Sequence, residues 1–155
     1  MMPIGQYLSI VTDLSFRKKS SEPGPSGNNL KPMNDLVYRW DSIQPDTPVP
    51  LLHRRLIKGE QILLAMIRLE KGCTVALHHH HSEQVAYVIS GRVRWGLGEP
   101  GTPERREFEM GGGEVLHLPS NLPHQIEALE ESQILDMLSP PGPMGVDQQN
   151  RASRE

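Results

Sequence analysis

The sequence predicts an all-β domain, either a sandwich or a barrel, and three observations lead to this fold class. Short segments rich in valine, isoleucine and leucine follow one another closely between residues 36 and 138. Glycine, proline and other turn-forming residues bound these segments. Several segments alternate apolar with polar residues, which is the period of a strand that buries one face. The close spacing of the segments fits short strands better than helices.

The expected strands are, in chain order, Leu36–Trp40, Leu51–Ile57, Ile62–Glu70, Thr74–His80, Gln84–Ile89, Arg92–Leu97, Arg106–Met110, Glu114–Pro119, His124–Ala128 and Ser132–Leu138. The composition of Leu63–Leu69 alone would also allow a helix. Its alternation with Arg68 and Glu70, together with its short flanking loops, favours a strand.

The 155 residues fit one domain that is large enough for a hydrophobic core of its own. Residues 1–35 are expected to be a flexible N-terminal extension, because the turn-forming stretch Ser20–Asn29 is poor in apolar residues. A short element around Gln6–Leu14 is a candidate for docking onto a second subunit. Residues 36–140 are expected to form the β-barrel domain, and the polar, proline-rich residues 141–155 a disordered tail.

Composition and charge exclude several classes of function. The net charge is −3, with 16 basic and 19 acidic side chains interspersed, so we expect no nucleic-acid partner. The single cysteine, Cys73, cannot form an intrachain disulfide and suits a reducing, cytoplasmic location. No apolar run reaches the roughly 18–20 residues that span a bilayer, so we expect no membrane partner.

Four consecutive histidines, His78–His81, are the strongest sign of function in the chain. Imidazole is the commonest protein ligand for divalent metals. Side chains alternate between the two faces of a strand, so His78 and His80 share one face and His79 and His81 the other. A return strand that begins near Gln84 would bring its amide oxygen to His78 and His80. These three residues are therefore candidate metal ligands.

A second segment, Gly113–His124, has the residues of a strand, a tight turn and a new strand. Pro119 ends the first strand, and Asn121 can adopt the left-handed conformation that a turn requires. Pro123 then orders the approach to His124, which begins the next strand. His124 is the natural candidate for a further metal ligand.

Together the two segments resemble the paired motifs of the cupin superfamily. The first motif is matched, with the family's spacing, by Gly72, His78, His80, Gln84 and Gly91. The positions of the second are occupied by Gly113, Pro119, Asn121, His124 and Ala128, of which Gly113, Pro119 and His124 match the family's residues. The resemblance covers roughly residues 50–140. It implies an antiparallel double-stranded jelly-roll barrel that binds one divalent metal ion, either Zn, Ni, Mn or Fe.

Gln84 is the most consequential departure from the family pattern, which has glutamate at this position. Three histidines and a neutral amide leave the +2 charge of a metal uncompensated, which favours polarisation of a carbonyl or carboxylate. Redox chemistry stays open, since Fe(II) and Mn(II) also accept such ligands. Glu83 could be the carboxylate ligand only if the turn is bulged, and otherwise is expected in a surface ion pair. Asn121 and Ala128 replace the second motif's glycine and asparagine.

Asp136 lies within an otherwise apolar strand and is the candidate catalytic residue. A carboxylate there must face the pocket or a strong hydrogen-bonding partner, because its burial alone is costly. This segment resembles small single-domain cupins linked to the metabolism of unsaturated uronates, in which the matching aspartate is a proposed acid/base. The resemblance implies metal-assisted isomerisation, tautomerisation or ring opening of a sugar acid. Those proteins carry an arginine after the double proline, where this chain has Gly142.

Two other functions stay open at this point, and with them the question of whether the protein is an enzyme. The first is an Fe(II)-dependent dioxygenase, for which an aromatic content of 5% gives little support. The second is a non-enzymatic cupin that binds or senses a small molecule. In each case the expected partner is a small-molecule ligand or substrate, and the expected assembly is a homodimer. Arg68 and Arg94 are candidate contacts for a substrate anion.

Overall fold

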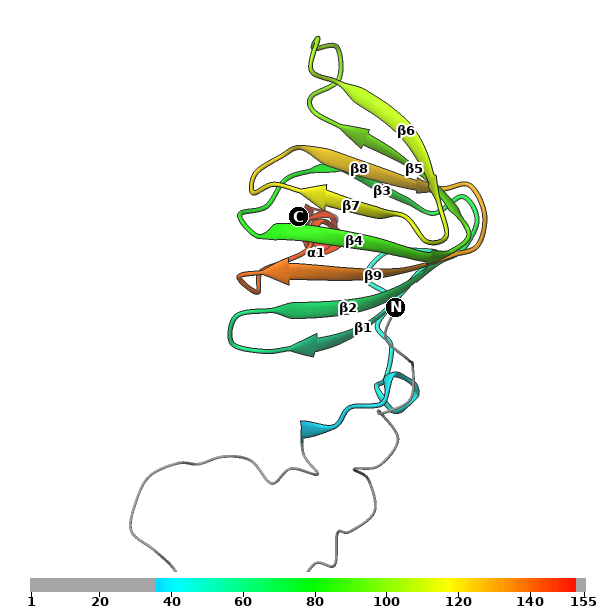
Figure 1. Ribbon diagram of the computed structural model, residues 1–155, viewed down its shortest axis with the longest axis vertical. Helices are drawn as coiled ribbons and strands as arrows, with labels where there is room; N and C mark the ends of the chain where they lie inside the picture. The colour runs from blue at the N-terminus through cyan, green and yellow to red at the C-terminus, as the bar shows by residue number, and fades with distance from the viewer. Residues whose placement is uncertain (1–35, 153–155) are drawn as a thin grey trace, which may run out of the picture. The chain divides into compact units, whose positions relative to one another are not determined.

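The computed structural model describes residues 36–152, which fold into two antiparallel β-sheets (Figure 1). The strands are β1 (Leu52–Lys58), β2 (Leu63–Leu69), β3 (Thr74–His78), β4 (Glu83–Ser90), β5 (Arg92–Leu97), β6 (Arg106–Gly111), β7 (Val115–Leu118), β8 (His124–Ala128) and β9 (Ser132–Ser139). The larger sheet has the order β1-β2-β9-β4-β7 and the smaller one β3-β8-β5-β6. Strands that are neighbours in a sheet are often distant in the chain, as in a jelly roll. The predicted all-β fold is confirmed.

Alternation along the strands produces the core between the sheets. In β4 and β9, every second residue is buried and the residues between them are less buried or exposed. This is the period expected of antiparallel strands that turn one face toward a core. The largest side chains that are almost completely buried include Leu52, Leu69, Val88, Val93, Leu118 and Leu138.

The expected strands match β1–β9 to within two residues at either end, except for Leu36–Trp40. Leu63–Leu69 is strand β2, as its alternation predicts. The expectation of a strand over Leu36–Trp40 is wrong, because a 3-10 helix, η2 (Trp40–Ser42), begins at its end. Val37 is 74% exposed, and strand-forming residues do not form a strand without a partner to pair with.

Strands β3 and β8 bring two distant parts of the chain into register. His78 and His124 are directly opposite each other in this antiparallel pair, and a bulge lies between Val75 and His78. Strand β3 ends at His78, two residues earlier than expected, so His80 lies in the loop that leads to β4. The pairing therefore places His124 of the second motif beside His78, the first residue of the histidine run.

The C-terminal segment differs from the predicted disordered tail, because it forms helix α1 (Gly145–Ala152). Its polar, proline-rich composition favours disorder, but long-range contacts stabilise the segment. Met144 and Val146 are 6% and 4% exposed, and Asp147 forms an ion pair with the buried Arg54. Within the described residues, no helix has the length and apolar character needed to span a membrane.

Candidate metal centre

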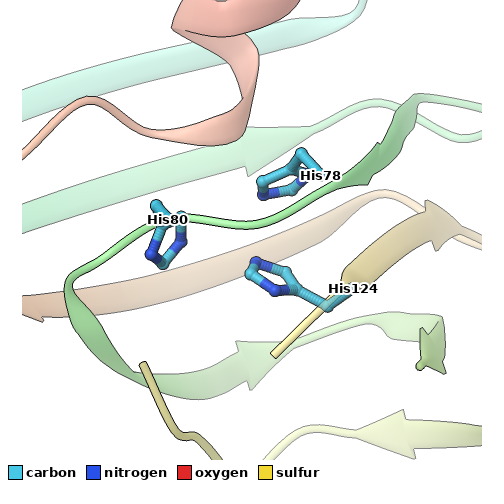
Figure 2. A group of neighbouring side chains, drawn as sticks. All are labelled: His78, His80 and His124. Carbon is cyan, nitrogen blue, oxygen red and sulfur yellow. The ribbon is translucent and has the colours of Figure 1, made fainter. Parts of the chain in front are cut away.

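Three histidines from three different segments meet at one point of the barrel (Figure 2). His78 is the last residue of β3, His80 lies in the following loop, and His124 is the first residue of β8. Their ligand atoms all lie within 4.8 Å of one another. The ring centroid of His124 is 4.2 Å from that of His78 and 5.0 Å from that of His80. His80 and His124 are buried, and His78 is half-buried.

The backbone orients each of these imidazole rings in the same way. Nδ1 of His78 lies 2.8 Å from the carbonyl oxygen of Ala76, and Nδ1 of His80 lies 2.8 Å from that of Ser82. Nδ1 of His124 is 2.7 Å from the carbonyl oxygen of Leu122. A carbonyl can only accept, so each Nδ1 carries the hydrogen and each Nε2 carries a lone pair.

Three Nε2 lone pairs are a donor set that suits a divalent transition metal or zinc. Backbone hydrogen bonds at the other ring nitrogen are the usual means by which proteins hold metal-binding histidines in position. The three residues can therefore hold a metal ion.

Gln84 lies at the same cluster. It is the second residue of β4 and is 4% exposed, and its Oε1 is 3.1 Å from Nε2 of His80. The side-chain amide thus reaches the nitrogen that would bind a metal. Its role as the fourth ligand stays a prediction.

A cavity of about 40 Å³ adjoins the histidines. Apolar side chains from both sheets form most of its wall, among them Leu52, Ile67, Leu69, Val75, Ile126 and Ile134. The polar side chains that reach it include His78, Gln84, His124 and Asp136. The site is therefore a small, largely apolar pocket with its polar groups gathered around the histidines.

Comparison with known protein families identifies the family to which this fold and histidine cluster belong. A family model described as the cupin domain matches residues 65–139. The chain belongs to the cupin family. The uncharacterised protein MJ1618 of Methanocaldococcus jannaschii is 35% identical over 102 residues, which are 61% of this cupin and 77% of that protein. Oxalate decarboxylase OxdC of Bacillus subtilis is 35% identical over 80 residues, which are 50% of this cupin but 20% of OxdC.

Solved structures agree with the family assignment at the level of the fold. KdgF from Halomonas sp. has a TM-score of 0.59 and 21% identity, over 66% of this cupin and 92% of KdgF. An RmlC-like cupin from Shewanella frigidimarina has a TM-score of 0.61 and 17% identity, over 67% and 89% of the two chains. At these identities the likeness concerns the jelly-roll fold alone.

Burial keeps the cupin's histidines in the form that binds metals. It lowers the pKa of His124 to about 4, and the neighbouring His78 contributes to the shift. Burial also lowers the pKa of His78. At neutral pH both imidazoles are therefore uncharged, and no proton has to leave before a metal binds.

Asp136 is the cupin's buried carboxyl group beside the histidines. It lies on β9 between Ala65 of β2 and Ala86 of β4, and it is 5% exposed. Burial raises its pKa to about 7, although a hydrogen bond with Gln84 opposes the shift. Among residues 36–152, Oδ1 of Asp136 has no hydrogen-bond partner. One oxygen of this carboxyl group is thus available to a molecule in the pocket.

Several other polar side chains lie outside the cupin's pocket. His79 and His81 are exposed, as expected, although they lie in the loop after β3 and not on a strand. Glu83 forms a surface hydrogen bond with His117, with 2.6 Å between its Oε1 and Nε2 of the imidazole.

The two arginines proposed as anion contacts also face outward. Arg68 pairs with Glu131, and Arg94 pairs with Glu109 and Glu127. Neither arginine lines the pocket, so the structure gives them no contact with a bound anion there.

Sequence reasoning missed one part of the cupin's pocket wall. Met144, Gly145 and Val146, just before and within the first turn of α1, line the same cavity as the histidines. The available signal was the pair of apolar residues in an otherwise polar tail, followed by Asp147 as a helix-start residue.

Proposed function

We propose that this cupin binds one divalent metal ion, either Zn, Ni, Mn or Fe, and converts a small oxygen-rich acid. Isomerisation, tautomerisation or ring opening are the reactions that such a site suits. The observation that carries the proposal is the common orientation of His78, His80 and His124, whose Nδ1 atoms are all engaged by backbone carbonyls. Gln84 would complete the ligand set as a neutral donor.

The residues around the histidines divide the chemical work. When bound, a divalent metal polarises a carbonyl or carboxylate oxygen of the substrate. Asp136 would move a proton at its free Oδ1, because it is the buried carboxyl group that reaches the same pocket. The apolar wall would exclude water and strengthen both interactions.

The pocket favours a compact acid over a full uronate. A cavity of about 40 Å³ is small beside the roughly 300–1,000 Å³ of typical ligand sites. Its apolar wall offers few partners for sugar hydroxyls, which are costly to bury without hydrogen bonds. The name of one curated relative, oxalate decarboxylase, denotes activity on a small dicarboxylate, in keeping with this substrate class. Glycine also stands at position 142, where the uronate-linked cupins carry arginine.

We expect Asp136→Asn to lower turnover by at least about 100-fold, because removal of a general acid or base typically costs 10²–10⁴ in rate. Metal content and KM should change little, since the amide keeps the shape of the carboxyl group. A thermal-shift screen against keto acids, uronates and phenols would first supply the substrate. Steady-state kinetics of the variant then provide the measurement. Unchanged turnover in Asp136→Asn would exclude this residue as the proton carrier.

The same screen separates the two other functions. A dioxygenase would consume oxygen when the Fe(II)-loaded protein meets a phenol or thiol. A sensory cupin would be stabilised by its ligand without forming a product. Product formation in an oxygen-free solution would support the proposed isomerase or lyase chemistry over both.

A further inference from the structure

The segment that follows the last strand covers the pocket, and we refer to residues 142–152 as the C-terminal cover. It includes α1, which packs against β3, the strand that ends at His78. In Figure 2 the chain leading into the helix passes beside the histidine cluster. Met144 and Val146 turn their buried side chains into the cavity. The cover thus forms the wall of the pocket nearest the candidate metal ligands.

Gly145 brings the cover into direct contact with a proposed ligand. A methyl group added at Gly145 would overlap Nε2, Cδ2 and Cε1 of His78 at almost equal distances. A point equally distant from these three atoms lies above the ring face, and not along the Nε2 lone pair. The glycine therefore lets the backbone pack on the imidazole ring while its lone pair stays free. A seated cover and a bound metal are compatible.

A buried arginine fastens the cover to the larger sheet. Arg54 of β1 is 5% exposed and donates to both carboxylate oxygens of Asp147, at 2.9 and 3.2 Å. The same guanidinium holds Asp46 on its other side. Asp147 also accepts a hydrogen bond from the backbone N–H of Met144 at 2.8 Å, which caps the first turn of the helix.

Further contacts fix the two ends of the cover. Ser82 donates to the carbonyl oxygen of Pro140 just before it, and Gln148 donates to the carbonyl oxygen of His79 at 3.0 Å. These contacts join the cover to the loop that carries His80. These hydrogen bonds are part-buried or exposed, so each stabilises the seated cover only modestly. A cover held in this way can open without unfolding the barrel.

The closed cover limits what can reach the histidines. A cavity needs a volume of roughly 10–15 Å³ to hold one water molecule. The cavity of about 40 Å³ therefore holds a ligand group of only a few heavy atoms. The apolar side chains of the strands are held in place by strand pairing within the two sheets. Met144 and Val146 pack in the same core cluster but belong to a segment outside both sheets, so they can move without breaking a strand ladder.

We infer that Met144 and Val146 are specificity-determining residues that set the size of the ligand reaching the metal, and that the Arg54–Asp147 pair holds them in place. The inference rests on the proposed metal pocket but on no particular reaction. Compact acids bind under the closed cover, and a larger acid binds after the cover moves.

Opening of the cover can be measured without a metal through Trp95, a 2%-exposed residue of the pocket wall. In a Trp40→Phe background, quenching of Trp95 fluorescence by acrylamide reports access to the cavity. Asp147→Asn should raise the quenching constant about fivefold, because loss of one ion pair of about 1 kcal/mol favours the open form by that factor. Glu131→Gln, which removes an exposed carboxylate paired with Arg68, is the matched control and should change nothing. Equal quenching in Asp147→Asn and the control would overturn the role of the Arg54–Asp147 pair.

Ligand size is tested with two carboxylate probes on the Co(II)-loaded protein, followed by its visible absorption spectrum. Met144→Ala should tighten benzoate binding at least about tenfold and leave acetate binding unchanged, since a methylene-sized change in a pocket typically alters affinity by 10–200-fold. Wild-type-like benzoate binding by a Met144→Ala protein that holds Co(II) would refute the size limit. A failure of the reaction proposed above would leave both measurements unaffected. If Met144→Ala does not fold, Val146→Ala provides the same comparison.

Discussion

Replacing His80 by alanine should lower the affinity for a divalent metal by more than about 100-fold, because loss of even an outer hydrogen-bond partner costs roughly 10–100-fold. His80 is buried, and its Nδ1 is held by the carbonyl oxygen of Ser82, so the substitution removes an Nε2 donor that is already in position. Metal analysis of protein purified without a nickel column, followed by competition titration with a chromophoric chelator, measures the change.

The histidine run provides its own controls for this experiment. His79→Ala and His81→Ala remove exposed imidazoles on either side of His80 and should leave metal content unchanged. Gln84→Ala should lower the affinity by about tenfold, a smaller loss, because a neutral amide is a weaker ligand than imidazole. Equal metal content in His80→Ala and His79→Ala would refute the three-histidine centre.

Gly91→Ala should destabilise the fold by at least about 3 kcal/mol, the sum of a left-handed backbone penalty and overpacking against a rigid neighbour. Gly91 has a φ angle of 86°. A methyl group there would overlap the backbone oxygen of Glu131 and lie 2.6 Å from Cα of Ser132. Urea denaturation in the presence of EDTA gives the free energy of unfolding without a contribution from bound metal.

Gly101→Ala is the matched control for this prediction. Its φ angle is 80°, but a methyl group at Gly101 would meet no atom within 4 Å. This substitution should therefore cost only the backbone term of about 1–2 kcal/mol. If the two variants lose the same stability, the close contact of Gly91 with Glu131 and Ser132 does not explain why the first motif ends in glycine.

Much of the fold and the histidine cluster could be predicted because both depend on local patterns. Apolar alternation locates strands such as β4 and β9, whose burial follows the same period. The spacing of His78, His80 and His124 in the sequence predicts that they meet. Strand pairing brings them together, with His78 opposite His124. The residue at which β3 ends could not be predicted from local patterns, because the bulge after Val75 depends on pairing with β8.

The remaining differences come from contacts between residues that are far apart in the chain. Helix α1 depends on Arg54, which is 93 positions before its partner Asp147, and no local pattern in the tail reveals that pair. The strand expected at Leu36–Trp40 does not form, because a long-range contact that it would need is missing among residues 36–152. Its residues have the propensity of a strand, but propensity acts only where a neighbouring strand is available.

The pocket and the hydrophobic core share the same side chains, which constrains how relatives of this protein can diverge. Six apolar side chains line the pocket and also belong to the core cluster: Leu52, Ile67, Leu69, Val75, Ile126 and Ile134. Widening the pocket by shortening one of them would cost roughly 2–5 kcal/mol, a large fraction of the 5–15 kcal/mol that holds a domain together. Met144 and Val146 belong to the same cluster but lie outside both sheets, where a changed side chain disturbs no strand pairing. Natural variation in ligand preference should therefore accumulate after residue 140, while the barrel interior changes slowly.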